Sequence, residues 1–99
     1  MVNARPQWGE ARADLAWIKY YEGKSDQAKA EMLTATQMDP THVGVGIAYA
    51  QMLAWSGDTP AAIGEVSRLR RANPDWSRSS ALDLAASWSK DATILANIP

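Results

Sequence analysis

Few side chains in this 99-residue sequence belong to the types that catalyse reactions or hold metals. His42 is the single histidine and cysteine is absent, so neither a catalytic triad nor a thiolate zinc site can be assembled. His42 follows a proline at a predicted helix start, which favours a capping or solvated role. Glu10 and Asp14 share a helix face at a spacing that could hold a metal, but hydrated helix faces show the same pattern. We expect no enzyme activity, no metal and no cofactor.

Two further patterns bear on phosphate and nucleic-acid ligands. The segment Gly44-Val45-Gly46 lacks the third glycine, the lysine and the preceding strand of a phosphate-binding loop. Arg68, Arg70, Arg71 and Arg78 form the one basic cluster, whereas a nucleic-acid face needs more cations with aromatic side chains between them. Arginines also suit a helix C-terminus. With a net charge of -1, the chain is not expected to bind nucleic acid.

Composition indicates one small globular domain, since 46% of the residues are apolar and 21% are charged. No apolar run approaches the roughly 20 residues that cross a bilayer. The first eight residues lack the basic head and apolar segment of a signal peptide. We therefore expect a cytoplasmic protein without membrane contact.

A turn segment that occurs twice organises the chain. Gly23-Lys24-Ser25-Asp26-Gln27-Ala28 recurs 34 residues later as Gly57-Asp58-Thr59-Pro60-Ala61-Ala62. In each copy a glycine suited to the left-handed conformation ends one helix, and Ser25 or Thr59 is expected to cap the next. Each copy therefore predicts a helical hairpin. The identities at this period are Ala16 with Ala50, Gly23 with Gly57, Ala28 with Ala62, Glu31 with Glu65, and Pro40 with Pro74.

Apolar residues at three- and four-residue steps predict helices over about 9–22, 25–38, 41–56 and 59–72. The core faces of the first two helices are expected to carry Ala11, Leu15, Ile18 and Tyr21 or Glu22, and Ala28, Met32, Ala35 and Met38. Those of the next two are expected to carry Val45, Tyr49, Met52 and Leu53, and Ala62, Ile63, Val66 and Leu69. After Pro74 the period lapses. Ser77 or Ser79 could cap a helix through Leu82, Ala85, Ala86 and Trp88, followed by a short helix with Ile94, Leu95 and Ile98.

This pattern resembles the tetratricopeptide repeat family, whose 34-residue unit reads W-x2-L-G-x2-Y, then A-x3-F, then P. The second half is present in both copies, as Ala28, Met32 and Pro40 and as Ala62, Val66 and Pro74. In the first half of the pattern, the Leu is kept as Leu15 in the first copy and is replaced by Tyr49 in the second. The Trp is replaced by Arg12 and Gly46, the Gly by Ala16 and Ala50, and the Tyr by Lys19 and Leu53. The resemblance covers about two thirds of the chain.

The resemblance implies an all-α fold of antiparallel hairpins stacked as a right-handed solenoid. The expected divisions are a loose lead-in at 1–8, two repeats at 9–42 and 43–76, and a capping segment at 77–99. Open helical stacks usually carry such an atypical end unit. Because at least three repeats are usually needed for stability, the chain is expected to self-associate or to be part of a longer array.

In the resembled family the first helices of successive repeats line a concave groove that receives a peptide. By that resemblance the groove would be lined by Asp14, Trp17, Tyr20, Tyr21, Ile47, Gln51, Ala54 and Trp55. Trp17 and Trp55 lie off the predicted core faces, so a contact outside the core is expected for both. Either the two indoles pack on each other or on the cap, or they meet a partner or a second copy.

The expected function is protein–protein interaction. Chaperone-tail binders of the family bind a terminal carboxylate with Lys and Asn side chains. Ala13, Trp17 and Ala48 stand at the corresponding places here, which argues against a terminal carboxylate as the ligand.

The ending Leu95–Pro99 also resembles the tail of tetratricopeptide regions attached to bacterial adenylate cyclases and winged-helix regulators. In that alternative the chain would be an excised sensory or scaffold appendage of a larger signalling protein.

Overall fold

The computed structural model describes residues 5–88 and 92–97, which form helices and no strand. Its elements are α1 (Arg5–Tyr21), α2 (Ser25–Met38), α3 (Val43–Trp55), α4 (Thr59–Ala72), α5 (Arg78–Trp88) and α6 (Ala92–Ala96). The all-α prediction is confirmed, and the bounds of α2 and α4 agree with the predicted ones. Helix α1 begins at Arg5, so residues 5–8 of the predicted lead-in are helical, and residues 1–4 lie outside the described part.

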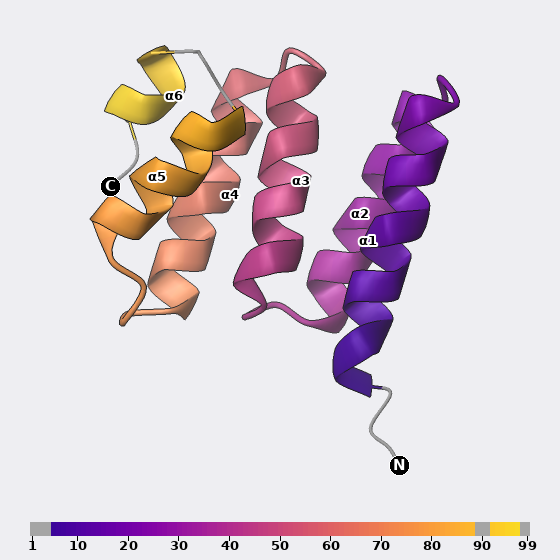
Figure 1. Cartoon of the computed structure of the whole chain (residues 1–99), viewed down its shortest axis with the longest axis horizontal. Coiled ribbons are helices and arrows are strands. Elements are labelled where there is room, and N and C mark those ends of the chain that lie inside the picture. The colour runs from indigo at the N-terminus through magenta and orange to yellow at the C-terminus, as the bar shows by residue number, and fades with distance from the viewer. Residues whose placement is uncertain (1–4, 89–91, 98–99) are drawn as a thin grey trace.

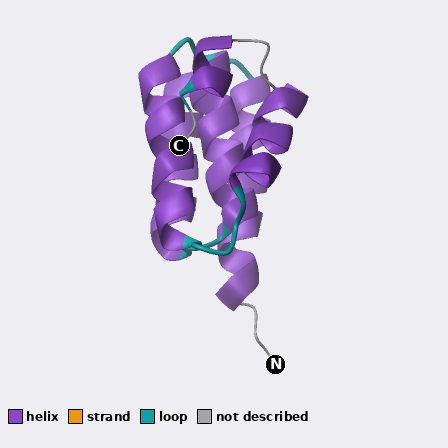
Figure 2. Cartoon of the chain, turned by 90° about the vertical axis from the view of Figure 1, so that its left-hand side faces the viewer, coloured by secondary structure: helices purple, strands orange, loops and turns teal. Residues whose placement is uncertain are grey.

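The helices pack as two hairpins, α1 with α2 and α3 with α4, that lie side by side (Figure 1). Helices α5 and α6 pack on the second hairpin, on the side away from α1. Figure 2 shows the connecting loops gathered at the ends of the helices. The molecule is therefore flat, with extents of 39 × 33 × 18 Å.

The two hairpin turns have the same hydrogen bonds. Gly23 and Gly57 adopt φ values of 85° and 91°, the left-handed conformation expected from the sequence. The next residue, Lys24 or Asp58, donates its amide to the carbonyl of Lys19 or Leu53 at 3.0 and 2.9 Å. This six-to-one bond defines a Schellman helix end, so both turns stop the first helix in the same way.

The helix caps differ in part from those expected. Ser25 and Thr59 are the first residues of α2 and α4 rather than their caps. Asp58 caps α4, its Oδ1 accepting from the amide of Ala61 at 3.2 Å, while Lys24, at the equivalent place, offers no oxygen. Aspartate is among the favoured residues at the position just before a helix, where its carboxylate can accept from a free amide.

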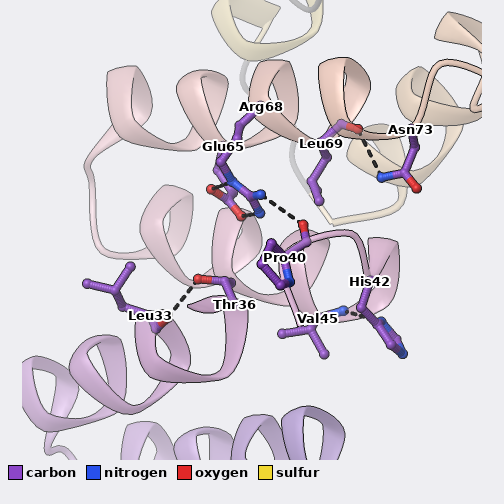
Figure 3. A network of polar contacts seen from close by, with 9 residues as sticks. All are labelled: Leu33, Thr36, Pro40, His42, Val45, Glu65, Arg68, Leu69 and Asn73. Carbon is purple, nitrogen blue, oxygen red and sulfur yellow. Dashed lines mark hydrogen bonds and ion pairs between the residues drawn. The ribbon is translucent and has the colours of Figure 1, made fainter. Parts of the chain in front are cut away.

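Two other predicted caps are present. His42 precedes α3, and its Nδ1 accepts from the amide of Val45 at 3.1 Å, which confirms the capping interpretation (Figure 3). The hydroxyl of Ser77 accepts from the amide of Ser80 at 3.0 Å at the start of α5. Helix N-termini leave free amides, and both side chains satisfy one of them.

The apolar interior consists of two clusters. The first core cluster lies between the first hairpin and α3 and contains Ala13, Ala16, Ala28, Met32, Ala35, Val45 and Met52. The second core cluster joins α3 and α4 to α5 and α6 and contains Ile47, Ala50, Leu53, Ala62, Val66, Leu69, Ala81, Ala85 and Ile94. These lists contain most of the residues predicted for the core faces of α2, α3 and α4. Tyr49 and Ile63 are half-buried and pack against the clusters, and Met38 is exposed. In the capping segment Leu82 and Leu95 are half-buried and Ala86 is exposed, while the side chains of Trp88 and Ile98 lie outside the described ones.

The predicted core face of α1 is wrong. Leu15, Ile18 and Tyr21 are 42%, 55% and 72% exposed, whereas Ala13 and Ala16 are buried. Small side chains on the buried face allow α1 to approach α2 and α3 closely, so the face with the larger apolar residues points outward. The pattern of large apolar residues therefore indicated the outer side of this helix.

Glu31 and Glu65, identical at the 34-residue period, both bind arginine. Glu31 accepts from Arg12 at 2.6 Å and from Lys19 at 3.2 Å, and these bonds lower the pKa of its carboxyl. Glu65 is buried and accepts from Nε and Nη2 of Arg68 at 2.9 and 2.6 Å. Figure 3 shows that Arg68 also reaches the loop between the hairpins, where Nη1 donates to the carbonyl of Pro40 at 2.9 Å. Arg68 thereby ties α4 to the inter-hairpin loop.

Candidate functional site

Four aromatic side chains gather where α1 and α3 end. Trp17 lies at the centre of this aromatic cluster, stacked on Tyr21 at 5.7 Å between ring centroids and edge-on to Tyr20 and Trp55, each at 5.5 Å. Tyr20 also approaches Trp55 at 6.4 Å. These separations and angles are typical of favourable aromatic pairs, so the four rings form one unit that spans both hairpins.

The hairpin arrangement explains why residues distant in sequence meet here. Tyr21 and Trp55 are the last residues of α1 and α3, each two residues before a turn glycine, and they are 34 residues apart. Because the two hairpins lie side by side, equivalent positions on α1 and α3 are neighbours (Figure 1). The two turns thus place a large ring at the same end of each first helix.

The aromatic cluster is partly buried and partly open. Trp17 and Tyr20 are half-buried and pack against the first core cluster, whereas Tyr21 and Trp55 are 72% and 45% exposed. The sequence left open whether Trp17 and Trp55 pack on each other, on the cap or on a partner. They do pack on each other, and this contact leaves Trp55 partly exposed. Trp17 also contributes to the interior, contrary to the expectation that it stands off the core.

A hollow of about 240 Å³ continues from Trp17 toward the start of both helices. Its lining residues are Ala13, Asp14, Trp17, His42, Gly44, Val45 and Ala48. Asp14 is exposed and brings a carboxylate to the rim. The hollow and the aromatic cluster share Trp17, and we call them together the α1–α3 surface.

The three remaining predicted groove residues, Ile47, Gln51 and Ala54, belong to neither the aromatic cluster nor the lining of the hollow. Gln51, equivalent to Trp17, is half-buried on α3. Ile47 is only 7% exposed and belongs to the second core cluster, and Ala54 packs against that cluster. Ile47 and Ala54 therefore lie on the side of α3 that the capping helices cover.

Sequence reasoning did not place His42, Gly44 or Val45 in the groove, and it named Ala13 and Ala48 only as positions that grip a ligand in the resembled family. Ala48 lies 34 residues after Asp14 and so takes the equivalent place on α3. His42 and Gly44 carried no such signal, since they belong to the loop and the first turn that bring α3 against α1. Their contribution depends on how the hairpins pack.

Metal-binding groups and membrane-spanning helices are two further features that the described residues could contain. No group of three or more side chains that could hold a metal occurs in ranges 5–88 and 92–97, and Asp14 lies exposed while the side chain of Glu10 is outside the described ones. Within the same ranges, no helix has the length and apolarity needed to cross a membrane. In the basic cluster Arg68 binds Glu65, and Arg70 donates to the carbonyl of Trp76.

Comparisons of the chain with protein-family models, with curated proteins and with solved structures found no match.

The α1–α3 surface itself offers three kinds of contact. Exposed ring faces can pack against apolar, proline or aromatic side chains, and they attract cations. The hollow beside Trp17 can receive one side chain, and Asp14 can bind a basic group at its rim.

Proposed function

We propose that the chain is a non-enzymatic, tetratricopeptide-like interaction module that binds a protein or peptide through the α1–α3 surface. The observation that carries the proposal is the aromatic cluster, in which Tyr21 and Trp55 remain 72% and 45% exposed while packed on Trp17. Tryptophan and tyrosine are among the residues most enriched at binding hot spots. Rings held in place by neighbouring rings also lose little conformational entropy on binding.

Internal equivalence supports the tetratricopeptide-like part of the proposal. The two turns share left-handed glycines and the same six-to-one hydrogen bond. Ala28 and Ala62, the small residues of the family pattern, are both fully buried. Two hairpins with these features would stack as the first turns of a right-handed solenoid, with α5 and α6 as the covering end.

The shape and charge of the surface favour a peptide ligand with particular side chains. The hollow of about 240 Å³ accommodates one apolar or aromatic side chain beside Trp17. A lysine or arginine on the ligand could approach the exposed Asp14 carboxylate or lie over the exposed ring of Trp55. The proposed partner therefore presents a basic residue next to an apolar one.

Selection of peptides from a random displayed library on the wild-type chain tests this function. Replacing Trp55 by alanine should weaken the binding of selected peptides by roughly thirtyfold or more, because truncation of a hot-spot ring costs about 2 kcal/mol or more. The readout is the dissociation constant from isothermal titration, with helix content checked by circular dichroism.

Leu84→Ala is the matched control, since Leu84 is a comparably exposed apolar residue on α5. It should leave peptide affinity unchanged. Equal binding of the selected peptides to wild type and to the Trp55 variant would remove the support for the α1–α3 surface.

A further inference from the structure

The aromatic cluster carries hydrogen-bond donors as well as ring faces. Within residues 5–88 and 92–97, the hydroxyl groups of Tyr20 and Tyr21 and the indole N–H of Trp17 make no hydrogen bond, although their rings contact one another. Trp17 and Tyr20 are half-buried, whereas Tyr21 is 72% exposed. Such groups usually find a partner where their rings are buried. The α1–α3 surface therefore offers a ligand both apolar faces and donors.

This combination selects among the backbone conformations of a peptide ligand. An α-helical peptide uses its carbonyl oxygens in its own hydrogen bonds. An added strand needs a sheet edge, and the described ranges contain no strand. A polyproline II segment makes no internal hydrogen bonds, so its carbonyl oxygens remain available as acceptors. Proline also lacks an N–H, so a proline-rich segment needs donors from its partner and few acceptors.

The spacing along α1 agrees with the repeat of that conformation. Asp14, Trp17 and Tyr21 lie on neighbouring turns of α1, and all three belong to the α1–α3 surface. Seven positions separate Asp14 from Tyr21, which is about 10 Å along a helix axis. Polyproline II rises about 3.1 Å per residue, so a residue and the third one after it are about 9 Å apart. One turn of such a ligand therefore reaches from Tyr21 to Asp14.

The charge at the Asp14 end of this row is negative. Asp14 is exposed at the rim of the hollow of about 240 Å³, and no lysine or arginine is among the described residues that line it. Its carboxylate can accept from a basic side chain of the ligand, and the paired N–H groups of arginine match a carboxylate best. The apolar part of the hollow, formed by Ala13, Val45 and Ala48, lies beside Trp17 and has room for a proline ring.

We propose that the α1–α3 surface binds a proline-rich segment of a partner protein in the polyproline II conformation, with a basic residue three positions from a proline. The proline packs on the exposed rings of Tyr21 and Trp55, and the basic residue binds the Asp14 carboxylate. The donors of the rings bond to carbonyl oxygens of the ligand. This inference rests on the proposed function, because it specifies the ligand of the same surface.

Isothermal titration of the full chain with three synthetic peptides tests the proposal. The probe is a peptide of Pro-Pro-Pro-Arg repeats, in which each arginine lies three positions from a proline. Ala-Ala-Ala-Arg repeats keep its charge without proline, and Pro-Pro-Pro-Glu repeats keep its conformation with the opposite charge. The probe should bind in a saturable manner and at least roughly tenfold more tightly than either control, because it alone is both pre-ordered and able to pair with Asp14.

Two conservative variants test the individual contacts. Tyr21→Phe keeps the ring and removes only the hydroxyl donor, so the dissociation constant of the probe should rise by about three- to tenfold. Asp14→Asn removes the charge and should bring the arginine and glutamate peptides to within about threefold of each other. Asp83→Asn is the matched control, since Asp83 is an exposed carboxylate on α5, and it should change neither affinity.

The proposal is overturned if either control peptide binds as tightly as the probe, or if Tyr21→Phe and Asp14→Asn leave the affinity of the probe unchanged. Peptides selected from the displayed library separate this result from a failure of the proposed function. If they bind in a Trp55-dependent manner but lack proline and do not compete with the probe, only the proposal of a proline-rich ligand fails. If neither the probe nor any selected peptide binds, both proposals fail.

Discussion

Replacing Gly46 by alanine is expected to lower the free energy of unfolding by about 1 to 3 kcal/mol, although alanine is the better helix former. Gly46 is buried in α3 next to the side chain of Leu69 in α4. A methyl group at this position would lie 2.5 Å from both terminal carbons of Leu69 and 2.8 Å from its Cγ. Leu69 is fully buried in the second core cluster, so its side chain has no free space to enter. Urea unfolding followed by circular dichroism measures the loss.

Gly64→Ala is the matched control within the same hairpin. Gly64 is exposed in α4, and a methyl group there would meet nothing within 4 Å. This change should raise stability by up to about 1 kcal/mol through helix propensity alone. In a Leu69→Ala background the cost of Gly46→Ala should disappear, because the three carbons that the added methyl group would meet all belong to the Leu69 side chain. Equal shifts for the two glycine variants would contradict the close approach of α3 and α4.

Arg68→Ala is expected to destabilise the chain by about 2 kcal/mol. The substitution leaves the Glu65 carboxylate, only 8% exposed, without the two hydrogen bonds it accepts from Arg68. It also removes the bond to the carbonyl of Pro40, which joins α4 to the loop between the hairpins (Figure 3). The partial exposure of Arg68 keeps the expected loss below that of a fully buried ion pair. Thermal and urea unfolding both report it.

Arg71→Ala provides the comparison, because Arg71 is an exposed arginine on the same helix. Its removal should change stability by no more than about 0.5 kcal/mol. If the two arginine variants unfold at the same urea concentration, the contact between Arg68 and the inter-hairpin loop does not contribute to stability.

Much of the fold could be predicted from local signals. The bounds of α2 and α4 follow from the turn glycines Gly23 and Gly57 and from the prolines that end each unit. Glycine supplies a left-handed residue and proline cannot continue a helix, so these limits depend only on the residue and its chain neighbours. The core faces of α3 and α4 were also predictable, because large apolar residues occupy them.

Features that depend on packing between helices were not predictable in this way. The buried face of α1 is lined by Ala13 and Ala16, which carry a weaker hydrophobic signal than the exposed Leu15 and Ile18. Glycine is a poor helix former, yet Gly46 is buried in α3, where its lack of a side chain makes room for Leu69. Both cases depend on the distance between two helix axes, which composition along one helix does not encode.

The candidate site was predicted in part. Trp17, Tyr20, Tyr21 and Trp55 do meet, as expected for neighbouring first helices at a 34-residue period. Ile47 and Ala54 were placed in the groove by the resemblance, but α5 extends the interior over that side of α3. After Pro74, where the 34-residue period lapses, two further helices could be anticipated from the sequence. The side of α3 that they cover could not.

Nitrogen-15 NMR of the five indole groups during titration with a selected peptide tests the proposed function most directly. Trp17 and Trp55 belong to the α1–α3 surface, whereas Trp76 packs against the second core cluster and serves as the internal control. We predict that the indole signals of Trp17 and Trp55 shift in a saturable manner while that of Trp76 stays in place. Saturable binding that moves Trp76 and leaves Trp17 and Trp55 unchanged would contradict the account.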